Sequence, residues 1–544
     1  MNTRQLQTDK NQKLYHALLG ILLVCALAMM MLLSYWACKY SYYGAVDGRT
    51  RGVLVRDKTW AHIAVFLAAS LCTIGIDKVL MKKDKSQQEK ICLCTLIVTS
   101  VIAFILGGFY VCKNPYYPVG DQINTTAFAA YCRDGNFIML SIGGYVGMYQ
   151  QQKGLGILYE ILFTLFGDFN YRPAKILHVV WWILTILAGY GFLKLNTDRP
   201  VFRMLYCVMM LSCFPLLFYL PYIYGDVLSI SFGIILFYGV AAYEHSGQKR
   251  YIVLASFAAG LAVLARKNTW IVLVAVAVYV LLASLRKWKV RYLLAGTAIL
   301  LTAALSVKAV DVIYEVRSGY PSGIGIPSIL WVAMGLQETE GRAGVYNRYQ
   351  QATFTDYDCQ QELAAQQGKE YIRERLEEFS QDPGMAFDFF KNKLEGQWIE
   401  PMYAALESTE SFEEGAELSP VLESLYYGEL GRTIWKLTNY YQSILYLAGL
   451  MALVMLGILW WKKKEVPISL WLPWIAVFGG FLFSILWEAK SRYVFPYCVF
   501  MILYAPEGLY QMGLLLCKLP KLRKFKKSGQ TQDKGEEASL RETA

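Results

Sequence analysis

The sequence predicts an all-α membrane protein with about twelve transmembrane helices and two extracytoplasmic loop regions, the second a small, mostly helical subdomain. Of its 544 residues, 56% are hydrophobic and only 17% are charged, and the mean hydropathy is +0.33. A soluble protein carries about 25% charged residues. Apolar runs recur along the whole chain, and a helix needs about 20 apolar residues to cross roughly 30 Å of hydrocarbon.

The first apolar run, about Tyr15 to Cys38, follows the basic residues Arg4, Lys10 and Lys13. It is too long for a signal peptide and no small-residue cleavage site follows it, so we expect a retained first helix. The other predicted spans lie at about 60–80, 91–112, 173–193, 204–221, 227–243, 251–265, 269–285, 292–310, 438–460, 468–487 and 493–516.

The Lys and Arg residues of the short loops predict the orientation, because such loops stay on the cytoplasmic side. Basic loops recur at every second connection, at 82–90, 194–203, 249–250, 286–291 and 462–464, and the tail at 518–527 is basic too. Both termini of this multi-pass protein are therefore expected on the cytoplasmic side of the cell membrane. The net charge of +11 then reflects topology rather than nucleic-acid binding. One loop departs from the rule, since 39–59 carries Arg49, Arg51, Arg56 and Lys58 but must lie outside.

This topology predicts five parts. Residues 1–90 form an N-terminal helical hairpin addition, and 91–310 form a transmembrane core with a first outer loop at 113–172. Residues 311–437 form the second outer region, 438–516 the C-terminal transmembrane helices, and 517–544 a basic and then polar cytoplasmic tail. The second outer region is rich in acids and has helix-like stretches near 369–380 and 384–396, so we expect a small subdomain or a lid.

Several classes of site find no support in the sequence. Most of the 12 Cys lie in apolar runs, as isolated buried thiols do. The 4 His are too scattered along the chain to build a metal site. The sequence has no glycine-rich phosphate loop and no nucleophile elbow.

Asp121 stands in the segment Gly120-Asp121-Gln122, shortly after an apolar run and directly before a helical pattern. One interpretation is that its carboxylate caps the next helix by accepting free backbone N–H groups. The other is that a carboxylate held beside a membrane-facing pocket acts as a general base. The two interpretations are compatible.

Arg266, Lys267 and Asn268 interrupt an apolar stretch that runs from 251 to 285. One straight helix over that stretch would be about 50 Å long, well beyond the bilayer core. A break at Arg266 also avoids a cost of roughly 2.5–3.5 kcal/mol for each cation at mid-membrane. The purely structural interpretation is a short loop whose charged side chains extend to the membrane surface. The functional one is an anion site, because Arg binds phosphate oxygens through a bidentate fork and Lys adds a point charge.

Two further polar groups fall on the same predicted side. The charged turn at 487–493 contains Glu488, Arg492 and Tyr493, and Asp226 begins another helix after a tyrosine-rich turn. A salt-bridged turn with an aromatic belt residue explains the first group without a ligand. Helix capping explains Asp226 in the same way.

Asp168, Arg172 and Lys175 follow a short apolar run at 154–167, which is too short to cross and is expected to lie along the membrane interface. All these residues together would set acids against cations on one membrane face. That arrangement suits a reaction in which a hydroxyl loses its proton while a phosphate departs, and a lipid phosphate needs no general acid to leave.

The order and spacing of these features resemble the GT-C type membrane glycosyltransferases, the group that includes protein O-mannosyltransferases and the lipid A aminoarabinose transferases. The features are Asp121 in the first large outer loop, a short apolar segment ending in Phe166-Gly167, Asp226 after the tyrosine-rich turn, and the basic turn at 266–268. The resemblance covers about 91–516. The segments 326–336 and 398–401 resemble parts of bacterial members that are believed to build cell-surface polysaccharide.

The resemblance implies an inverting transfer of a sugar from a polyprenyl-phosphate donor to an extracytoplasmic acceptor, which is a cell-surface glycan, a lipid-linked glycan or a protein. It implies that Asp121 is the catalytic carboxylate and that Arg266 and Lys267 bind the donor phosphate, with membrane lipids as the surroundings. The full set of substrate-binding residues is then Arg266, Lys267, Asp226, Asp168, Arg172, Lys175, Glu488, Arg492 and Tyr493. No cofactor is assigned, and a divalent cation on Asp121 and Asp226 stays open.

The sequence departs from the family in two extra N-terminal helices and in Gly-Asp-Gln where many relatives have Asp-Glu. Two rival classes stay open. A transporter or flippase of lipid-linked sugars should show an internal repeat with charges near the bilayer midplane, whereas the charges here cluster at one face. A polysaccharide polymerase or ligase also acts outside on lipid-linked sugars, and the early position of Asp121 favours the transferase. A non-catalytic scaffold would tolerate the loss of Asp121.

Overall fold

The computed structural model describes residues 3–44, 52–286 and 290–518. Nine helices in this described part are long and apolar enough to cross a membrane. They are α1 (Thr3–Lys39), α2 (Thr59–Leu80), α3 (Lys85–Lys113), α7 (Arg172–Asn196), α10 (Asp226–Ser246), α12 (Trp270–Arg286) continued by the preceding turn from Lys267, α13 (Val290–Ser318), α20 (Glu429–Trp461) and α21 (Leu472–Leu486) continued by the preceding turn from Ile468. The chain is therefore an all-α, multi-pass membrane protein, as its composition predicts.

Three predicted spans differ from these nine. The last one, 493–516, is bent: α22 (Ser491–Met501) and the helical segment Ala505–Lys518 meet at 60° and form a tenth span when taken together. The 204–221 run is divided between α8 (Pro200–Leu211) and α9 (Phe214–Phe218), because Pro215 has no backbone N–H and disfavours a helical residue before it. The 251–265 run is α11 (Lys249–Ala265), whose 17 residues extend only about 26 Å.

The predicted break at Arg266 is confirmed. Helix α11 ends at Ala265, the 3-10 turn η2 (Lys267–Thr269) follows, and α12 begins at Trp270. The apolar stretch from 251 to 285 is thus two helices, and its cations lie at their junction.

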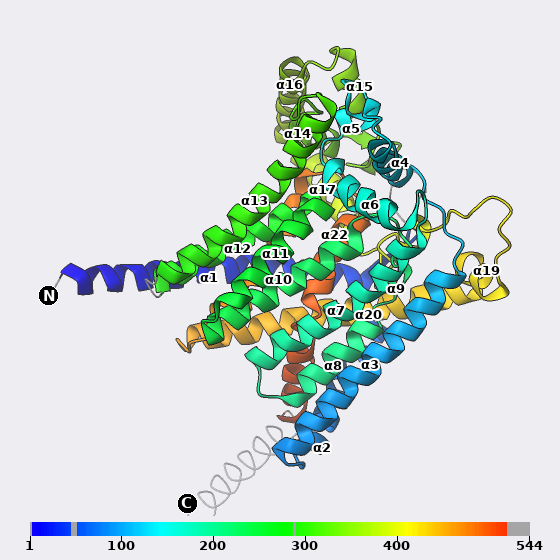
Figure 1. Cartoon of the computed structure of the whole chain (residues 1–544). Helices are drawn as coiled ribbons and strands as arrows, with labels where there is room; N and C mark the ends of the chain where they lie inside the picture. Colours follow the sequence, from blue (N-terminus) through cyan, green and yellow to red (C-terminus); the bar gives the residue numbers. More distant parts are fainter. Residues whose placement is uncertain (1–2, 45–51, 287–289, 519–544) are drawn as a thin grey trace, which may run out of the picture.

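The connections at one end of the spans are themselves helical. Between α3 and α7 lie α4 (Asp121–Arg133), η1 (Ile138–Leu140), α5 (Tyr145–Met148) and α6 (Gln152–Phe166). Between α13 and α20 lie α14 (Ser328–Gly335), the paired strands β3 (Glu338–Thr339) and β4 (Arg342–Ala343), α15 (Tyr349–Asp356), α16 (Gln361–Gln381), α17 (Pro383–Trp398), α18 (Ala405–Ser408) and α19 (Pro420–Tyr427). The predicted stretches 369–380 and 384–396 lie within α16 and α17. Helices α4, α5, α14, α15 and α16 gather beyond one end of α13 (Figure 1).

A two-stranded hairpin follows α1. Strands β1 (Tyr40–Tyr43) and β2 (Val53–Arg56) pair antiparallel. The Tyr42 N–H donates to the Ile399 carbonyl at 3.1 Å, and the Trp435 indole N–H donates to the Tyr42 carbonyl at 3.1 Å. The loop that departs from the positive-inside bias therefore lies against the end of α17 and the start of α20. Its Arg49 and Arg51 lie outside the described residues.

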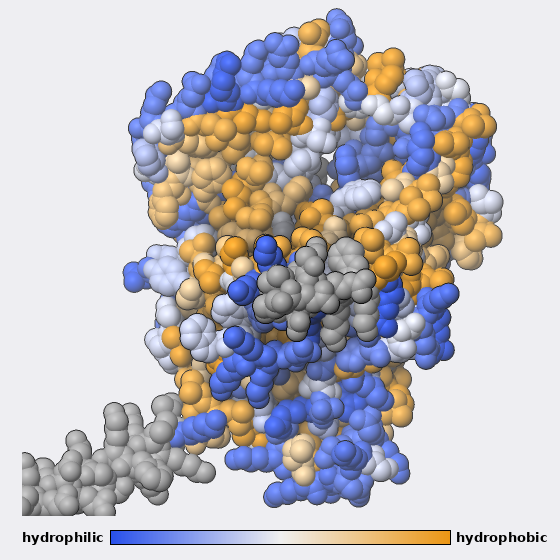
Figure 2. Space-filling view, turned by 90° about the vertical axis from the view of Figure 1, so that its left-hand side faces the viewer, coloured by the Kyte–Doolittle hydropathy of each residue, from blue (hydrophilic) through white to orange (hydrophobic). Residues whose placement is uncertain are grey.

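The core lies between the spans. Helix α10 packs against α7 and α11, α11 against α13, and α1 against α20, while η3 (Ile468–Trp471) leads into α21. The largest fully buried side chains include Trp182, Trp398, Trp471 and Trp474. Figure 2 shows apolar residues over much of the upper half of one face, below a hydrophilic rim. An apolar outer surface of this kind is what a lipid environment requires.

Candidate functional site

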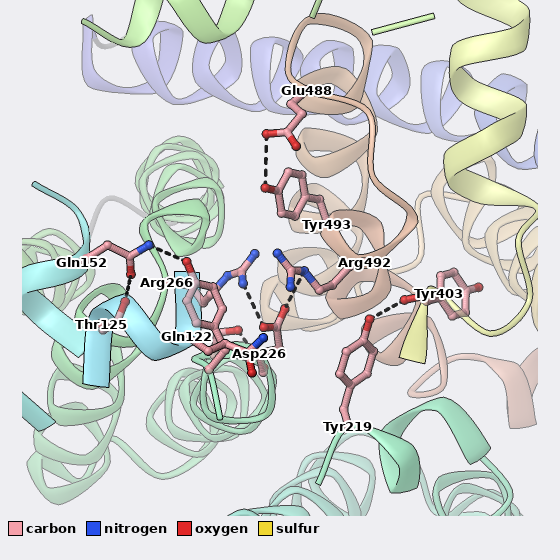
Figure 3. Close-up of polar contacts among 12 residues, drawn as sticks. Gln122, Thr125, Gln152, Tyr219, Asp226, Arg266, Tyr403, Glu488, Arg492 and Tyr493 are labelled. Carbon is pink, nitrogen blue, oxygen red and sulfur yellow. Dashed lines mark hydrogen bonds and ion pairs between the residues drawn. The ribbon is translucent and has the colours of Figure 1, made fainter. Parts of the chain in front are cut away.

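Three charged side chains from distant parts of the chain meet near the ends of α10, α11 and α22 (Figure 3). An Arg266 guanidinium nitrogen lies 2.9 Å from one Asp226 carboxylate oxygen, and Arg492 Nε lies 4.0 Å from the other. The Asp226 side chain is 3% exposed, and each arginine side chain is 11% exposed. We call Asp226, Arg266 and Arg492 the arginine–aspartate cluster.

Two glycines allow this meeting. A Cβ on Gly225 would lie 2.0 Å from the Ala265 carbonyl oxygen, and a Cβ on Gly154 would lie 2.5 Å from the Leu264 carbonyl oxygen. Only glycine permits such close backbone contact. The end of α11 is therefore held between the start of α6 and the residue before α10, which brings Arg266 onto Asp226.

Tyrosine rings surround both guanidinium groups. The central carbon of Arg266 lies 5.0 Å from the ring centre of Tyr224 and 5.4 Å from that of Tyr493. The central carbon of Arg492 lies 5.2 Å from the ring centre of Tyr222 and 5.5 Å from that of Tyr224. Each cation–π contact contributes roughly 0.5–2 kcal/mol. The rings thus orient both cations.

A pocket adjoins the cluster. It is lined by residues of α10, the α11–α12 turn and α22, namely Ser229, Arg266, Asn268, Thr269, Val272, Arg492, Tyr493, Pro496, Tyr497 and Phe500. Within the described residues, Arg492 Nε has no hydrogen-bond partner. A mostly buried guanidinium group with an unpaired donor is suited to an anion that offers several oxygen atoms.

Asp121 is the first residue of α4 and is exposed. The N-cap position belongs to Gly120, and the Tyr145 hydroxyl donates to the Asp121 carboxylate at 2.9 Å. Burial raises the pKa of Tyr145, so its phenol stays protonated and remains a donor. Asp226 likewise follows a glycine N-cap, Gly225. Neither aspartate therefore occupies the helix-capping position that the structural interpretation predicted.

Hydrogen bonds connect Asp121 to the arginine–aspartate cluster. Thr125 Oγ1 donates to the Asp121 backbone oxygen at 2.7 Å and lies 3.2 Å from Gln152 Oε1. Gln152 Nε2 donates to the Tyr224 hydroxyl at 2.5 Å, and Figure 3 shows Gln152 reaching from α6 toward the cluster. Because the Tyr224 ring faces both arginines, Asp121 and the cluster belong to one site.

Glu488 and Tyr493 border the same site. The Tyr493 hydroxyl donates to the Glu488 carboxylate at 3.4 Å (Figure 3). Lys490 Nζ lies 3.1 Å from the same carboxylate. Tyr493 also faces Arg266. The structure thus brings together Asp121, Asp226, Arg266, Arg492, Glu488 and Tyr493 from the predicted set.

Other predicted residues have different neighbours. Asp168 pairs with Arg133. Lys175 is buried, and its ammonium donates to the carbonyls of Asn114 at 3.4 Å and Tyr116 at 2.8 Å. Lys175 therefore secures the segment before α4 and is not free for a ligand.

Arg172 and Lys267 are both exposed. Neither side chain forms an ion pair with the part of the chain that the structure describes. Lys267 directly follows Arg266, so its charge lies near the cluster. Arg172 begins α7 and has no contact with the cluster among the ion pairs of the described residues.

The site does not fit the divalent cation that the sequence left open. The Asp226 carboxylate faces two guanidinium groups, which would repel a metal ion, and Asp121 faces a tyrosine hydroxyl instead. In residues 3–44, 52–286 and 290–518, no three His, Cys, Asp or Glu side chains group in a way that could hold a metal. The charges favour an anion.

Sequence reasoning missed the residues that connect the two parts of the site. Gln152, Thr125 and Tyr145 carry no signal on their own, because polar residues are common in a segment that is predicted to lie outside the membrane. Tyr222 and Tyr224 belong to the tyrosine-rich turn before Asp226, which was the one visible signal for the aromatic wall.

The chain matches no known protein-family model, no curated protein and no solved structure. Its function therefore has to be argued from the chemistry of this site.

Proposed function

We propose that this protein is an inverting glycosyltransferase of the cell membrane, which moves a sugar from a polyprenyl-phosphate donor to an acceptor outside the cell. The observation that carries the proposal is the arginine–aspartate cluster. Contacts through Tyr224, Gln152 and Thr125 connect its two mostly buried guanidinium groups to the backbone of Asp121, whose carboxylate is exposed.

The donor phosphate binds between Arg266 and Arg492. A glycosyl phosphodiester carries one negative charge and free oxygens that accept the paired N–H groups of a guanidinium fork. Since the cluster lies at the ends of helices that cross or enter the membrane, the polyprenyl tail stays in the bilayer while the sugar faces Asp121. Arg492 supplies the second phosphate contact that the resemblance gives to Lys267, and the exposed Lys267 adds charge at the edge.

The reaction is a single displacement at the anomeric carbon. The acceptor hydroxyl oxygen forms a bond to that carbon while the bond from the carbon to the phosphate oxygen breaks, and the phosphate oxygen keeps the electron pair. Asp121 takes the proton of the attacking hydroxyl. The leaving polyprenyl phosphate gains one negative charge, which Arg266 and Arg492 stabilise. Attack opposite the leaving group inverts the configuration.

The environment of Asp121 suits a base. Its carboxylate is exposed and accepts a bond from Tyr145, so an acceptor hydroxyl has access to it. Glu488, beside Tyr493, orients the donor sugar. The helices α14 to α19 select the acceptor, which is a cell-surface glycan, a lipid-linked glycan or a protein.

The position of the charges favours a transferase over a transporter. Asp226, Arg266 and Arg492 stand at helix ends rather than in the middle of a span, whereas transporters of charged substrates place their sites near the bilayer midplane.

The proposal is tested by binding of radiolabelled polyprenyl phosphate to the purified full chain in detergent. Arg492→Gln should weaken binding about tenfold or more, because a charge-assisted bond contributes roughly 1.5–3 kcal/mol. The matched control is Arg199→Gln, since Arg199 also pairs with a buried aspartate, Asp77, at 2.9 Å but lines no part of the pocket. Equal affinity of native protein and Arg492→Gln would refute the phosphate site.

A further inference from the structure

The arginine–aspartate cluster has an uneven charge. Two guanidinium groups face one carboxylate, so the cluster carries one net positive charge. Asp226 bonds closely with Arg266 at 2.9 Å, whereas Arg492 stays 4.0 Å away. A buried ion pair that served only to stabilise the fold would need one arginine, and the second one adds a desolvation cost.

Nearby charges change this balance little. Lys267 follows Arg266, but its side chain is exposed, so solvent and salt screen its charge. Glu488 pairs with Lys490 at 3.1 Å, and Asp121 lies beyond Gln152 and Tyr224. Among the described residues, the ion pairs of Arg266 and Arg492 are both with Asp226. Asp226 is thus the anion that a bound phosphate must compete with.

The reaction changes the charge of the bound lipid. The donor is a phosphodiester with one negative charge, whereas the leaving polyprenyl phosphate is a monoester with a charge near −2 above its second pKa of about 6. The donor neutralises the cluster. The product overcharges it by about one unit, and the Asp226 carboxylate then repels the product across a few ångströms.

We propose that Asp226 is a positioning residue that makes the cluster prefer the singly charged donor over the doubly charged product, and so promotes release of polyprenyl phosphate after transfer. This inference rests on the proposed function. Asp226 does not touch the reacting atoms; it acts by holding Arg266 and by competing with the lipid phosphate for both guanidinium groups.

The test compares the affinities of two lipids for the full chain in detergent at pH 8. One is polyprenyl phosphate, and the other is its methyl phosphodiester, which carries a single charge and no sugar. The native protein should bind the diester at least as tightly as the monoester. Asp226→Asn should shift the ratio of affinities toward the monoester by about tenfold, since one charge at about 4 Å supplies that much at an effective dielectric between those of water and protein.

Two variants separate this effect from a loss of structure. Asp226→Glu keeps the charge and should keep the native ratio. Asp77→Asn removes another buried aspartate that pairs with an arginine at 2.9 Å, and it should leave the ratio unchanged. If Asp226→Asn does not fold, Arg492→Gln tests the same balance in the opposite direction and should weaken monoester binding more than diester binding.

An unchanged ratio in Asp226→Asn, or in Arg492→Gln where that variant replaces it, would overturn the inference. If the native protein binds neither lipid, the proposed function fails, and inorganic phosphate then decides the inference about the cluster. In that case, phosphate should raise the melting temperature of Asp226→Asn more than that of the native protein, and an equal rise would overturn the inference as well.

Discussion

Two carboxylates in the candidate site have opposite surroundings. Asp121 is exposed and accepts a tyrosine hydroxyl, whereas Asp226 is 3% exposed and faces two cations. An acceptor hydroxyl can reach the exposed carboxylate of Asp121, whereas the buried carboxylate of Asp226 faces two guanidinium groups. This difference in access is why the proposed mechanism uses Asp121 as the base and Asp226 as the counter-ion.

A third acid gives a prediction about pH and stability. Glu400 is fully buried, and its carboxylate accepts the N–H groups of Met402 at 2.8 Å and Ala404 at 2.6 Å. Burial raises its pKa from 4.5 to about 8. The folded state therefore keeps a proton that the unfolded state releases, so this contribution to stability is complete below about pH 4.5 and is lost as the pH rises through 8. Glu400→Gln should flatten the fall in melting temperature between about pH 5 and pH 8, measured on the purified protein. A native slope in the variant would show that Glu400 does not titrate in this range.

Among the contacts between helices, the close approach of the start of α10 to the end of α11 depends on glycine. A Cβ on Gly225 would meet the Ala265 carbonyl oxygen at 2.0 Å, so Gly225→Ala must push the two helix ends apart and separate Asp226 from Arg266. Overpacking of this kind costs about 1–3 kcal/mol, and we expect a lower melting temperature with weaker polyprenyl phosphate binding. Gly108→Ala is the control, because no atom lies within 4 Å of the added Cβ. Equal losses in both variants would contradict a specific role for the junction.

Helix α6 gives a prediction about the membrane interface. Its first half is buried, but Ile161, Leu165 and Phe166 are 53%, 68% and 53% exposed. The 15 residues of α6 span only about 22 Å, too little to cross the bilayer, so the apolar half should lie in the interface. A phospholipid with a photoactivatable acyl chain should label 161–166 in proteoliposomes. Leu376 in α16, also 53% exposed, is the control that should stay unlabelled. Labelling of 161–166 no stronger than that of Leu376 would place α6 away from lipid.

The sequence predicts elements better than contacts. The spans and the break at Arg266 follow from hydropathy, because the bilayer imposes the same length and polarity on every helix. The division of 204–221 was missed, although Pro215 marks it. The partners of Asp168 and Lys175 could not be predicted, since Arg133 and the Asn114 and Tyr116 carbonyls reach them only through the packing of α4, α6 and α7. The contact of Arg492 with Asp226 also depends on tertiary packing. From the sequence we could predict only that both residues lie on the same side of the membrane.

At the scale of the whole molecule, a buried lysine connects the region between α13 and α20 to the site. Lys393 Nζ in α17 donates to the carbonyls of Gly335 and Ile485, and the Ala489 N–H donates to the Gly344 carbonyl at 2.7 Å. These hydrogen bonds hold the turn that precedes Arg492 against α17 and the segment between α14 and α15. Burial lowers the pKa of Lys393 to about 7, so its charge depends on the pH near neutrality.

Lys393→Met should therefore loosen this turn. The substitution leaves two buried carbonyls without their donor, at a cost of about 1–3 kcal/mol. Amide hydrogen exchange across 485–492 should become faster, and polyprenyl phosphate should bind more weakly. Lys391→Met is the control on the same helix, since Lys391 is less buried. Exchange at the native rate in Lys393→Met would show that the region does not support the site.

The most direct test of the proposed mechanism is sugar transfer in membranes that are supplied with radiolabelled polyprenyl-phosphate sugars, comparing the native chain with Asp121→Asn at equal expression. A general base typically raises the rate of the chemical step by about 10²–10⁴-fold. We therefore expect the rate of sugar transfer by Asp121→Asn to fall by a factor of that size, while binding of the donor is retained. Full transfer by Asp121→Asn would contradict this expectation and would remove Asp121 from the mechanism.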